Sequence, residues 1–309
     1  MSTLFASVAA HPATDADPRP ALFDGSAPSL ACQRRGAGPL VMCLHSSTGS
    51  QAQWRTLTDR LADRAEVISP DLYGHGRSPA WPEGAANTLD TDARAVMALA
   101  QAQRPGLAQE GMHLVGHSYG GAVALRIALR HPQLVRSLTV YEPVLFGLLG
   151  NGAVGDDATD QALEEIREIA RSVASLVRAG ELAAAAQVFV AYWGGAAAWH
   201  AMNEAQQATV VYRISTIPRH FDALFAVRPD ARLWQRLQMP VWLLHGSATR
   251  PSARAVADRL ASLLPSVQRA EIRGAGHLGP VTQAATVADA MAWPLTASLV
   301  AEPAAAMPA

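Results

Sequence analysis

The feature that most constrains this chain is a Gly-x-Ser-x-Gly motif that runs from Gly116 to Gly120, with Ser118 at its centre. An apolar run precedes the motif and a helical pattern follows it, so we expect Ser118 on a sharp turn between a strand and a helix. A serine held on such a turn has strained backbone, and its crowded neighbours two positions before and after it must lack a Cβ. The turn would lift the Ser118 hydroxyl above the sheet and direct the Tyr119 N–H to where an oxyanion would form. A serine in an ordinary glycine-rich turn is the alternative, but the flanking strand and helix favour a nucleophile.

Apolar strand-like runs and helical patterns alternate along most of the chain. A continuous apolar run is typical of a strand buried on both faces of a parallel sheet. We expect such strands at residues 40–44, 67–71, 113–115, 137–142, 240–245 and 267–272, and helices at 51–63, 91–103, 122–130, 251–264 and 281–300. One or two short edge strands are expected within residues 20–38. This alternation predicts an α/β fold with a doubly wound, mostly parallel sheet.

The composition excludes several kinds of chemistry. With 309 residues, 50% hydrophobic side chains and a net charge of −1, the chain can bury a large core and does not attract nucleic acid or an anionic membrane. The absence of lysine excludes a Schiff-base lysine, and with it pyridoxal phosphate chemistry, and also a P-loop lysine. Cys32 and Cys43 are expected to be free thiols in a reducing compartment, and no apolar run approaches the ~20 residues that span a bilayer. We therefore expect a cytoplasmic protein without a membrane or nucleic-acid partner; the sequence predicts no oligomeric state.

Three further segments resemble motifs of the α/β-hydrolase fold family. Residues 45–47 read His-Ser-Ser, similar to the family's His-Gly followed by an oxyanion-hole residue, with serine in place of the glycine. Residues 71–78 are similar to the family's Asp-x-x-Gly-x-Gly-x-Ser, and residues 274–277 (Gly-Ala-Gly-His) resemble the segment that carries the catalytic histidine. The resemblance extends over about residues 20–298, and together these motifs are more specific than the serine motif alone.

The strand pattern stops between residues 145 and 230, where helices are expected at 159–179, 181–192, 202–214 and near Phe221. This is the place where the family inserts its cap. The resemblance therefore implies a helical cap at 145–230 within a core formed by 20–144 and 231–300. Residues 1–19 are expected to be a disordered leader and residues 301–309 a disordered tail.

The predicted cap contains many aromatic side chains. We predict that Phe146, Trp193 and Trp199 line an apolar substrate pocket. For any one of them, packing within the cap is the alternative and is the more common role of such side chains. As a group they indicate a substrate with an apolar part.

A nucleophilic serine needs a base, and the base needs an acid that orients it. His277 is the predicted base because it follows the last expected strand, which keeps the chain order serine, acid, histidine. The backbone N–H groups of Tyr119 and of Ser47 or Ser46 are the predicted oxyanion hole. The other histidines are interpreted as parts of motifs or loops, or, for His220 and two others, as surface residues at helix ends or in the cap.

The acid departs from the family's pattern. The family usually has an aspartate after the strand that ends here near Gly246. The corresponding position in this chain is Thr249, and there is no Asp or Glu between Gly246 and Asp258. Glu142, at the end of an earlier strand, is the predicted acid; some haloalkane dehalogenases, relatives on this fold, place their acid on that strand end. An ordinary strand-end carboxylate is the alternative for Glu142, and Asp71 is interpreted as an acceptor that fixes a loop.

Together these features predict a serine hydrolase that cleaves a carboxylic ester, or a similar acyl bond, of a small, partly apolar substrate. Three alternatives remain open: a ligand-binding protein with slow or absent turnover, a cofactor-free perhydrolase, and a carbon–carbon bond hydrolase. Residues 274–279 also satisfy Gly-x-Gly-x-x-Gly, but a dinucleotide site requires a later strand that carries an acid, and none is expected. We therefore expect no dinucleotide, and we expect no other cofactor and no metal.

Overall fold

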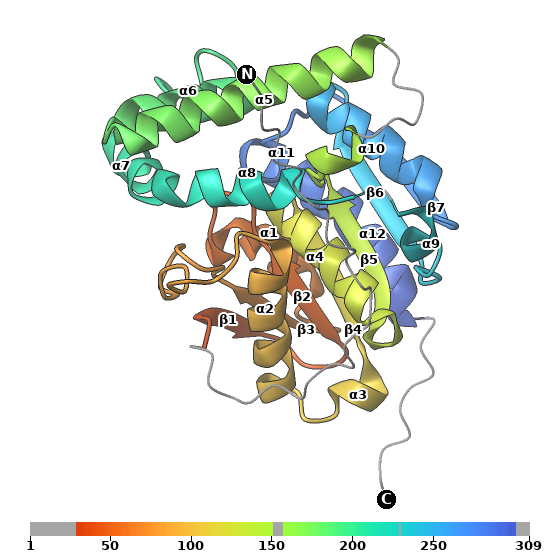
Figure 1. The fold of residues 1–309 in the computed structure, drawn as a ribbon. Helices are drawn as coiled ribbons and strands as arrows, with labels where there is room; N and C mark the ends of the chain where they lie inside the picture. Colours follow the sequence, from red (N-terminus) through yellow and green to blue (C-terminus); the bar gives the residue numbers. More distant parts are fainter. Residues whose placement is uncertain (1–28, 151–156, 229, 301–309) are drawn as a thin grey trace, which may run out of the picture.

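The computed structural model describes residues 29–150, 157–228 and 230–300. Seven strands of these residues form one sheet in the order β1-β3-β2-β4-β5-β6-β7 (Figure 1). The strands are β1 (Cys32–Arg35), β2 (Leu40–Leu44), β3 (Glu66–Pro70), β4 (Met112–His117), β5 (Val135–Tyr141), β6 (Val241–Gly246) and β7 (Val267–Ile272). The edge strand β1 pairs antiparallel with β3, and all the other pairs are parallel. The predicted α/β fold with a mostly parallel, doubly wound sheet is confirmed.

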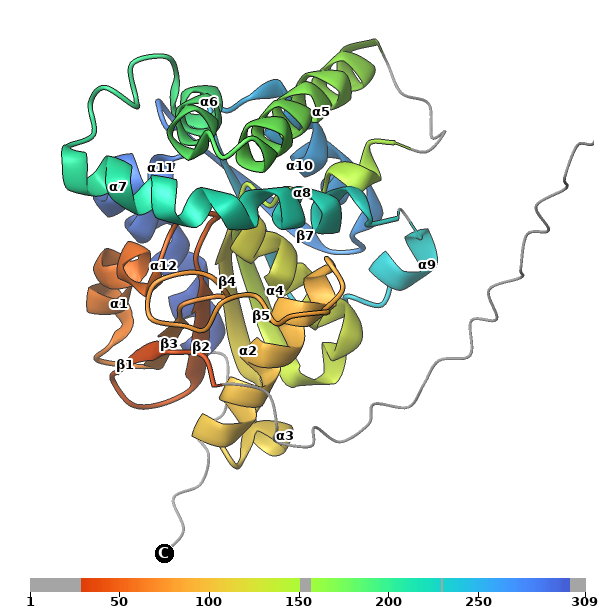
Figure 2. The ribbon, with the colours of Figure 1, turned by 60° about the vertical axis from the view of Figure 1, so that its left-hand side comes forward.

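Helices cover both faces of the sheet (Figure 2), which explains why its central strands β2, β4 and β5 are buried almost throughout. On one face lie α1 (Arg55–Leu61) and α12 (Ala284–Val300), and on the other lie α2 (Leu89–Gln103), α4 (Tyr119–Arg130) and α10 (Pro251–Leu263). Because side chains alternate along a strand, Val41 and Cys43 of β2 pack in the first of these layers and Met42 packs in the second. Both cysteines are free, and Cys43 is buried.

Most elements lie within a few residues of their predicted bounds, but two predicted helices are divided. The one at 51–63 consists of a 3₁₀ helix, η1 (Gln51–Trp54), followed by α1, and the one at 281–300 consists of α11 (Gly279–Thr282) and α12. The backbone of Gln283 (φ −130°, ψ 43°) breaks the helical conformation between α11 and α12. Short elements that were not predicted include α3 (Leu107–Glu110), η2 (Pro132–Leu134) and α9 (Ala231–Trp234). The predicted leader, the predicted tail and residues 20–28 lie outside the described residues.

The chain between β5 and β6 is helical. After η3 (Phe146–Leu148) come α5 (Asp157–Arg178), α6 (Leu182–Gly194), α7 (Glu204–Arg213), η4 (Ile214–Thr216) and α8 (Ile217–Phe225). In Figures 1 and 2 the helices α5 to α8 form a layer over one end of the sheet. They occupy the segment predicted as the cap, and they lie above the turn where β4 ends and α4 begins. Ligands in open α/β sheets bind at the carboxyl ends of the strands, so this layer encloses the expected position of a site.

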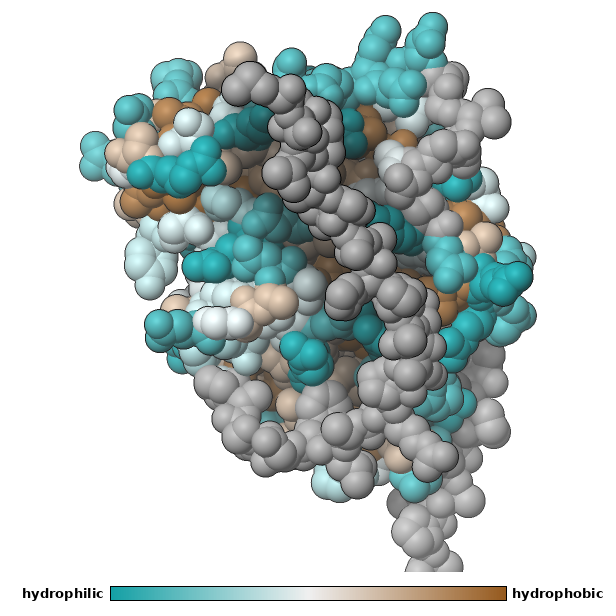
Figure 3. Space-filling view, viewed as in Figure 1, coloured by the Kyte–Doolittle hydropathy of each residue, from teal (hydrophilic) through white to brown (hydrophobic). Residues whose placement is uncertain are grey.

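The surface is mixed. Hydrophilic residues cover much of the described part of the face in Figure 3, and apolar residues form separate areas between them. Large apolar side chains that are well exposed include Tyr212, Val281 and Trp293. None of the helices in the described residues is long and apolar enough to cross a membrane.

Candidate active site

Ser118 lies on the turn between β4 and α4 with a positive φ of 54° and a ψ of −119°, a conformation that residues with a side chain rarely adopt. A Cβ on Gly120 would lie 2.3 Å from the Leu44 carbonyl oxygen, and a Cβ on Gly116 would lie 2.6 Å from the Gly120 carbonyl oxygen. The turn therefore requires both glycines of the motif. The Ser118 N–H donates to the Tyr141 carbonyl at 3.0 Å, which ties the strained residue to β5.

Three side chains that are distant in the sequence form a chain of hydrogen bonds at this turn. Ser118 Oγ lies 2.9 Å from His277 Nε2, and His277 Nδ1 lies 2.7 Å from Glu142 Oε2. All three residues are buried. Since a carboxylate can only accept, the proton of neutral His277 is on Nδ1 and its Nε2 is left to accept the Ser118 hydroxyl proton. The structure thus brings together the residues predicted as nucleophile, base and acid.

Glu142 directly follows β5 and has a φ of 43°. Its Oε1 accepts the Gly246 N–H at 2.8 Å, and its Oε2 accepts the Thr249 hydroxyl at 2.5 Å in addition to His277. Burial by itself would raise the pKa of Glu142, but the hydrogen bond and charge of His277 and the hydrogen bonds from Thr249 and Gly246 outweigh it, and the pKa is lowered. The carboxylate is therefore held charged next to the imidazole.

Thr249 occupies the position where the family usually has its acid, and it acts there as a donor. Its hydroxyl and the Gly246 N–H, both at or after the end of β6, point at the carboxylate that comes from β5. The sequence analysis predicted Glu142 as the acid, but for Thr249 it showed only that a carboxylate was missing after β6. A polar residue in that place, with a glutamate at the end of the neighbouring strand, was the available signal for this arrangement.

Contacts with β4, β5 and α6 fix the loop that carries His277. The His277 carbonyl accepts from His117 Nε2 at 2.9 Å, and the Gly276 carbonyl accepts the Tyr141 hydroxyl at 2.8 Å. The Trp193 ring of α6 stacks on the His277 ring with a centroid distance of 3.8 Å and an angle of 28°. These contacts restrict the imidazole to one orientation and shield it from water.

The loop after β2 contains the second predicted oxyanion donor. The Ser46 N–H donates to Gln53 Oε1 at 3.2 Å, and the Ser46 hydroxyl donates to the same oxygen at 2.9 Å. Ser46 is therefore already engaged, which favours the Ser47 N–H over the Ser46 N–H as the donor. Tyr119 is the first residue of α4, so its N–H has no partner within the helix.

His220 is buried, and the prediction that it lies on the cap surface is wrong. Only 1% of it is exposed; its Nδ1 lies 2.9 Å from Ser47 Oγ, and its ring stacks on Tyr119 at 3.7 Å between centroids. Burial, together with the neighbouring His75, holds its pKa well below the ordinary value for histidine. The sequence contained a signal for this position, because His220 lies three residues after the buried Ile217 and so on the inner face of α8.

The cavity next to Ser118 has a volume of about 290 Å³. Trp193 lines it together with Ser118, His277, Ser46 and Ser47, as predicted from their expected positions. Its other lining residues come from the loop after β2, from η1, from α6, α7 and the segment before α7, and from the start of the C-terminal helices: Thr48, Gly49, Ser50, Gln53, Phe189, Val190, Met202, Gln206, Thr209, Val210, Arg213, Leu278 and Val281.

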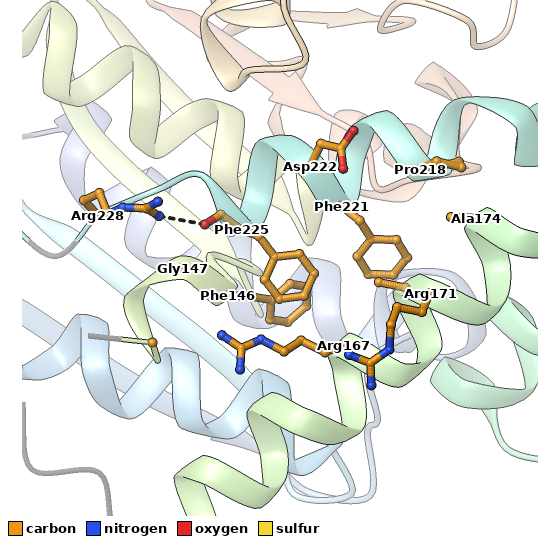
Figure 4. Close-up of a pocket in the computed structure, with 12 residues that line it drawn as sticks. Phe146, Gly147, Arg167, Arg171, Ala174, Pro218, Phe221, Asp222, Phe225 and Arg228 are labelled. Carbon is orange, nitrogen blue, oxygen red and sulfur yellow. Dashed lines mark hydrogen bonds between the residues drawn. The ribbon is translucent and has the colours of Figure 1, made fainter. Parts of the chain in front are cut away.

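Phe146 and Trp199, the other two predicted pocket residues, do not line this cavity. Phe146 is fully buried and faces a second groove of about 490 Å³, where its ring lies against Phe225 with Arg167 nearby (Figure 4). It follows β5 on η3, which directs its ring towards α5 and α8. Trp199 is partly buried and packs against the core between α6 and α7. Trp199 thus packs as the alternative expected, whereas Phe146 lines a groove other than the one next to Ser118.

Asp71 accepts hydrogen bonds that fix the loop after β3, in agreement with its interpretation as a loop-fixing acceptor. Its two carboxylate oxygens accept the N–H groups of Gln51 at 2.8 Å and Arg77 at 3.0 Å. A Cβ on Gly76 would lie 2.1 Å from this carboxylate, so the loop closes tightly around it. In the part of the chain that the structure describes, no group of three or more His, Cys, Asp or Glu side chains is arranged to hold a metal.

The family model for the α/β hydrolase fold matches residues 39–284. The chain belongs to the α/β hydrolase fold family. Among curated relatives it is similar to Lipase LipV of Mycobacterium tuberculosis (37% identity over 118 residues, 38% of this chain and 42% of that protein). It is also similar to fluoroacetate dehalogenase of Burkholderia sp. (33% over 121 residues, 39% of this chain and 40% of that protein). The matches to these two α/β hydrolase relatives span about two fifths of their length.

Solved structures of the same fold match over more of the chain. A thermophilic esterase from Thermogutta terrifontis superposes with a TM-score of 0.67, covering 87% of this chain and 93% of that chain at 22% identity. At this identity the match shows the shared fold.

Proposed function

We propose that this α/β hydrolase family member is a serine hydrolase that cleaves a carboxylic ester, or a similar acyl bond, of a small and partly apolar substrate. The observation that carries the proposal is the hydrogen-bonded chain from Ser118 through His277 to Glu142, buried beside a cavity of small-molecule size. The similarity to a protein named lipase supports the same class of reaction.

In the proposed mechanism His277 takes the Ser118 proton as the hydroxyl attacks the acyl carbonyl carbon. The negative charge on the carbonyl oxygen is held by the N–H groups of Tyr119 and Ser47. His277 then gives its proton to the leaving group, and an acyl-enzyme remains on Ser118. Water attacks this acyl-enzyme with His277 again as base, which releases the acid and restores the serine.

The negative charge of Glu142 has a defined part in this cycle. It holds the Nδ1 proton, which keeps Nε2 free as the base, and it stabilises the imidazolium that forms when His277 takes the serine proton. Two donors other than His277 hold the carboxylate in place, so its direction does not depend on the imidazole alone. The stacked Trp193 ring excludes water from one face of the imidazole.

The ligand-binding alternative is less well supported, and so is the dehalogenation that the name of one relative suggests. The ligand-binding alternative depended on a missing acid at Thr249, and Glu142 supplies a carboxylate to His277 from β5 instead. The resemblance implies that a dehalogenase on this fold would use an aspartate carboxylate as its nucleophile, whereas the residue on this turn is Ser118. The hydrolase mechanism needs no further group to complete it.

The test is labelling with a fluorophosphonate together with turnover of p-nitrophenyl esters of graded acyl length. The wild-type chain should be labelled on the peptide that contains Ser118 and should hydrolyse short or medium esters. Ser118→Ala should abolish labelling and lower kcat by roughly 10⁴–10⁶. Turnover of the variant close to that of the wild type would reject Ser118 as the nucleophile.

A further inference from the structure

The cavity next to Ser118 has a cation in one wall. Arg213, the last residue of α7, lines the cavity, and no Asp or Glu is among its lining residues. The acid whose charge acts on Arg213 is Asp71, but both carboxylate oxygens of Asp71 already accept backbone N–H groups. The positive charge therefore faces a cavity that offers no carboxylate of its own.

The contacts of Arg213 use only part of its donor capacity. Its Nη1 donates to the Thr48 carbonyl at 2.7 Å and to the Gly49 carbonyl at 2.8 Å. These contacts do not use the three N–H donors on Nε and Nη2, which form the planar fork that fits a carboxylate. Burial lowers the pKa of Arg213, with Asp71 acting in the opposite direction, so the guanidinium has lost part of its hydration. An anion in the cavity would replace that hydration.

Arg213 is near the reacting centre. Thr48, whose carbonyl it contacts, directly follows Ser47, the proposed oxyanion donor. Since adjacent Cα atoms are about 3.8 Å apart, the guanidinium lies within roughly 10 Å of the Ser47 N–H. Because Arg213 and Ser118 line the same cavity, a group bound to Arg213 could belong to the same small molecule as a carbonyl carbon held at Ser118.

The rest of the cavity suits the body of such a molecule. Its apolar wall is formed by Phe189, Val190, Trp193, Met202, Leu278 and Val281. The volume of about 290 Å³ is at the small end of ligand cavities. One apolar wall and one guanidinium in so small a space fit a short molecule with an apolar body and one anionic end.

We propose that Arg213 binds a carboxylate of the substrate, so that the enzyme acts on an ester or related acyl compound that also carries a free carboxylate. This inference rests on the proposed serine hydrolase function and names its substrate class. A charge-assisted, two-pronged contact of this kind corresponds to about 10- to 100-fold in kcat/KM relative to the uncharged substrate.

The experiment compares pairs of substrates in which one carboxylate is free in one member and methylated in the other. The monoester of adipic acid with p-nitrophenol is compared with its methyl ester, and 4-acetoxybenzoate with methyl 4-acetoxybenzoate. The first pair places the carboxylate on the acyl side and the second on the leaving-group side. The measured quantity is the ratio of kcat/KM for the anionic member to kcat/KM for the neutral member, corrected for the alkaline hydrolysis rate of each ester.

The variants are Arg213→Gln, Arg213→Lys and, as a control, Arg232→Gln at an exposed arginine in α9. Loss of the contacts with Thr48 and Gly49 lowers both members of a pair together and leaves their ratio unchanged. Loss of carboxylate binding lowers the ratio. We expect Arg213→Gln to lower the ratio by about 10- to 100-fold for at least one pair, Arg213→Lys to lower it less, and Arg232→Gln to leave both ratios as in the wild type.

The outcomes separate the two proposals. If the wild-type chain prefers neither anionic ester, or if Arg213→Gln keeps the preference, the carboxylate site is wrong although the hydrolase function stands. If neither the neutral nor the anionic esters are turned over and the fluorophosphonate does not label Ser118, the proposed function itself fails.

Discussion

Replacing Glu142 with glutamine tests whether this residue is the acid of the triad, in place of the aspartate that the family usually has after β6. The carboxylate accepts on both oxygens: Gly246 N–H on Oε1, and His277 and the Thr249 hydroxyl on Oε2. A glutamine amide has only one acceptor oxygen. The Gly246 N–H is part of the backbone and cannot turn away, whereas the Thr249 hydroxyl can rotate and accept. The amide oxygen therefore stays with Gly246, and the NH₂ group faces His277.

This arrangement disables the base. An NH₂ group opposite Nδ1 favours the tautomer of His277 that carries its proton on Nε2, and that proton then points at Ser118 Oγ, 2.9 Å away. The base would have to change tautomer before it could accept the serine proton, and the imidazolium would have lost its counter-charge. The same change in a serine–histidine–aspartate triad costs about 10⁴ in kcat, or about 5.4 kcal/mol in the activation barrier. We expect a loss of up to this size for Glu142→Gln, with KM changed much less.

The assay is steady-state hydrolysis of the best p-nitrophenyl ester, accompanied by thermal unfolding to show that the variant folds. Glu271→Gln is the matched control, because Glu271 is a half-exposed acid of β7 that pairs with Arg254 outside the cavity. It should keep wild-type kcat. If a folded Glu142→Gln retains nearly full activity while Asp71→Asn collapses, the acid is assigned to the wrong residue.

Three smaller perturbations test the surroundings of this group. Thr249→Val removes one donor to Glu142 and should lower kcat by only about 3- to 10-fold, in the same assay; a loss as large as that of Glu142→Gln would contradict an auxiliary role. His220→Phe keeps a flat ring over Tyr119 but removes the partner of Ser47 Oγ, so kcat should fall by about 10-fold, and an unchanged kcat would mean that this contact does not position the oxyanion hole. Burial lowers the pKa of several histidines, among them His45, to about 3, and His75, His117 and His220, all well below the ordinary value. Below about pH 6.5 these histidines are protonated in the unfolded chain but stay neutral in the folded chain. The folded state is therefore most stable above that pH, and the free energy of unfolding falls with the pH by up to about 1.4 kcal/mol per pH unit for each histidine. Asp92, whose pKa burial raises to about 6, opposes this by one proton; urea unfolding at pH 7, 6 and 5 measures the slope, and a free energy of unfolding that does not change would refute it.

The fold could be predicted from the sequence because its signals are local. The apolar run of β2 and the helical period of α4 each depend on residues close together in the sequence, and the predicted doubly wound, mostly parallel sheet follows from the alternation of such segments. The predictions of helix bounds and of pocket-lining side chains were weaker, because the local sequence does not determine where a helix is interrupted or which ring faces a cavity. The helix predicted at 51–63 is divided into η1 and α1, and aromatic residues of the cap indicated a pocket without showing which rings face it. Trp193 lines the cavity, while Phe146 faces another groove.

The sequence by itself determined the turn at Ser118, because the steric need for Gly116 and Gly120 is a property of a few consecutive residues, and it determined the layered sheet that carries this turn. Only the tertiary structure decided how polar groups pair across the ends of the strands. Thr249 meets Glu142 across 107 positions and His220 meets Ser47 across 173, and neither pair leaves a periodic pattern in the sequence. The physical reason is that apolar burial requires only the right kind of side chain on the right face, whereas a buried hydrogen bond requires two particular atoms at one distance and angle, and these are set when the cap and the strand ends pack together.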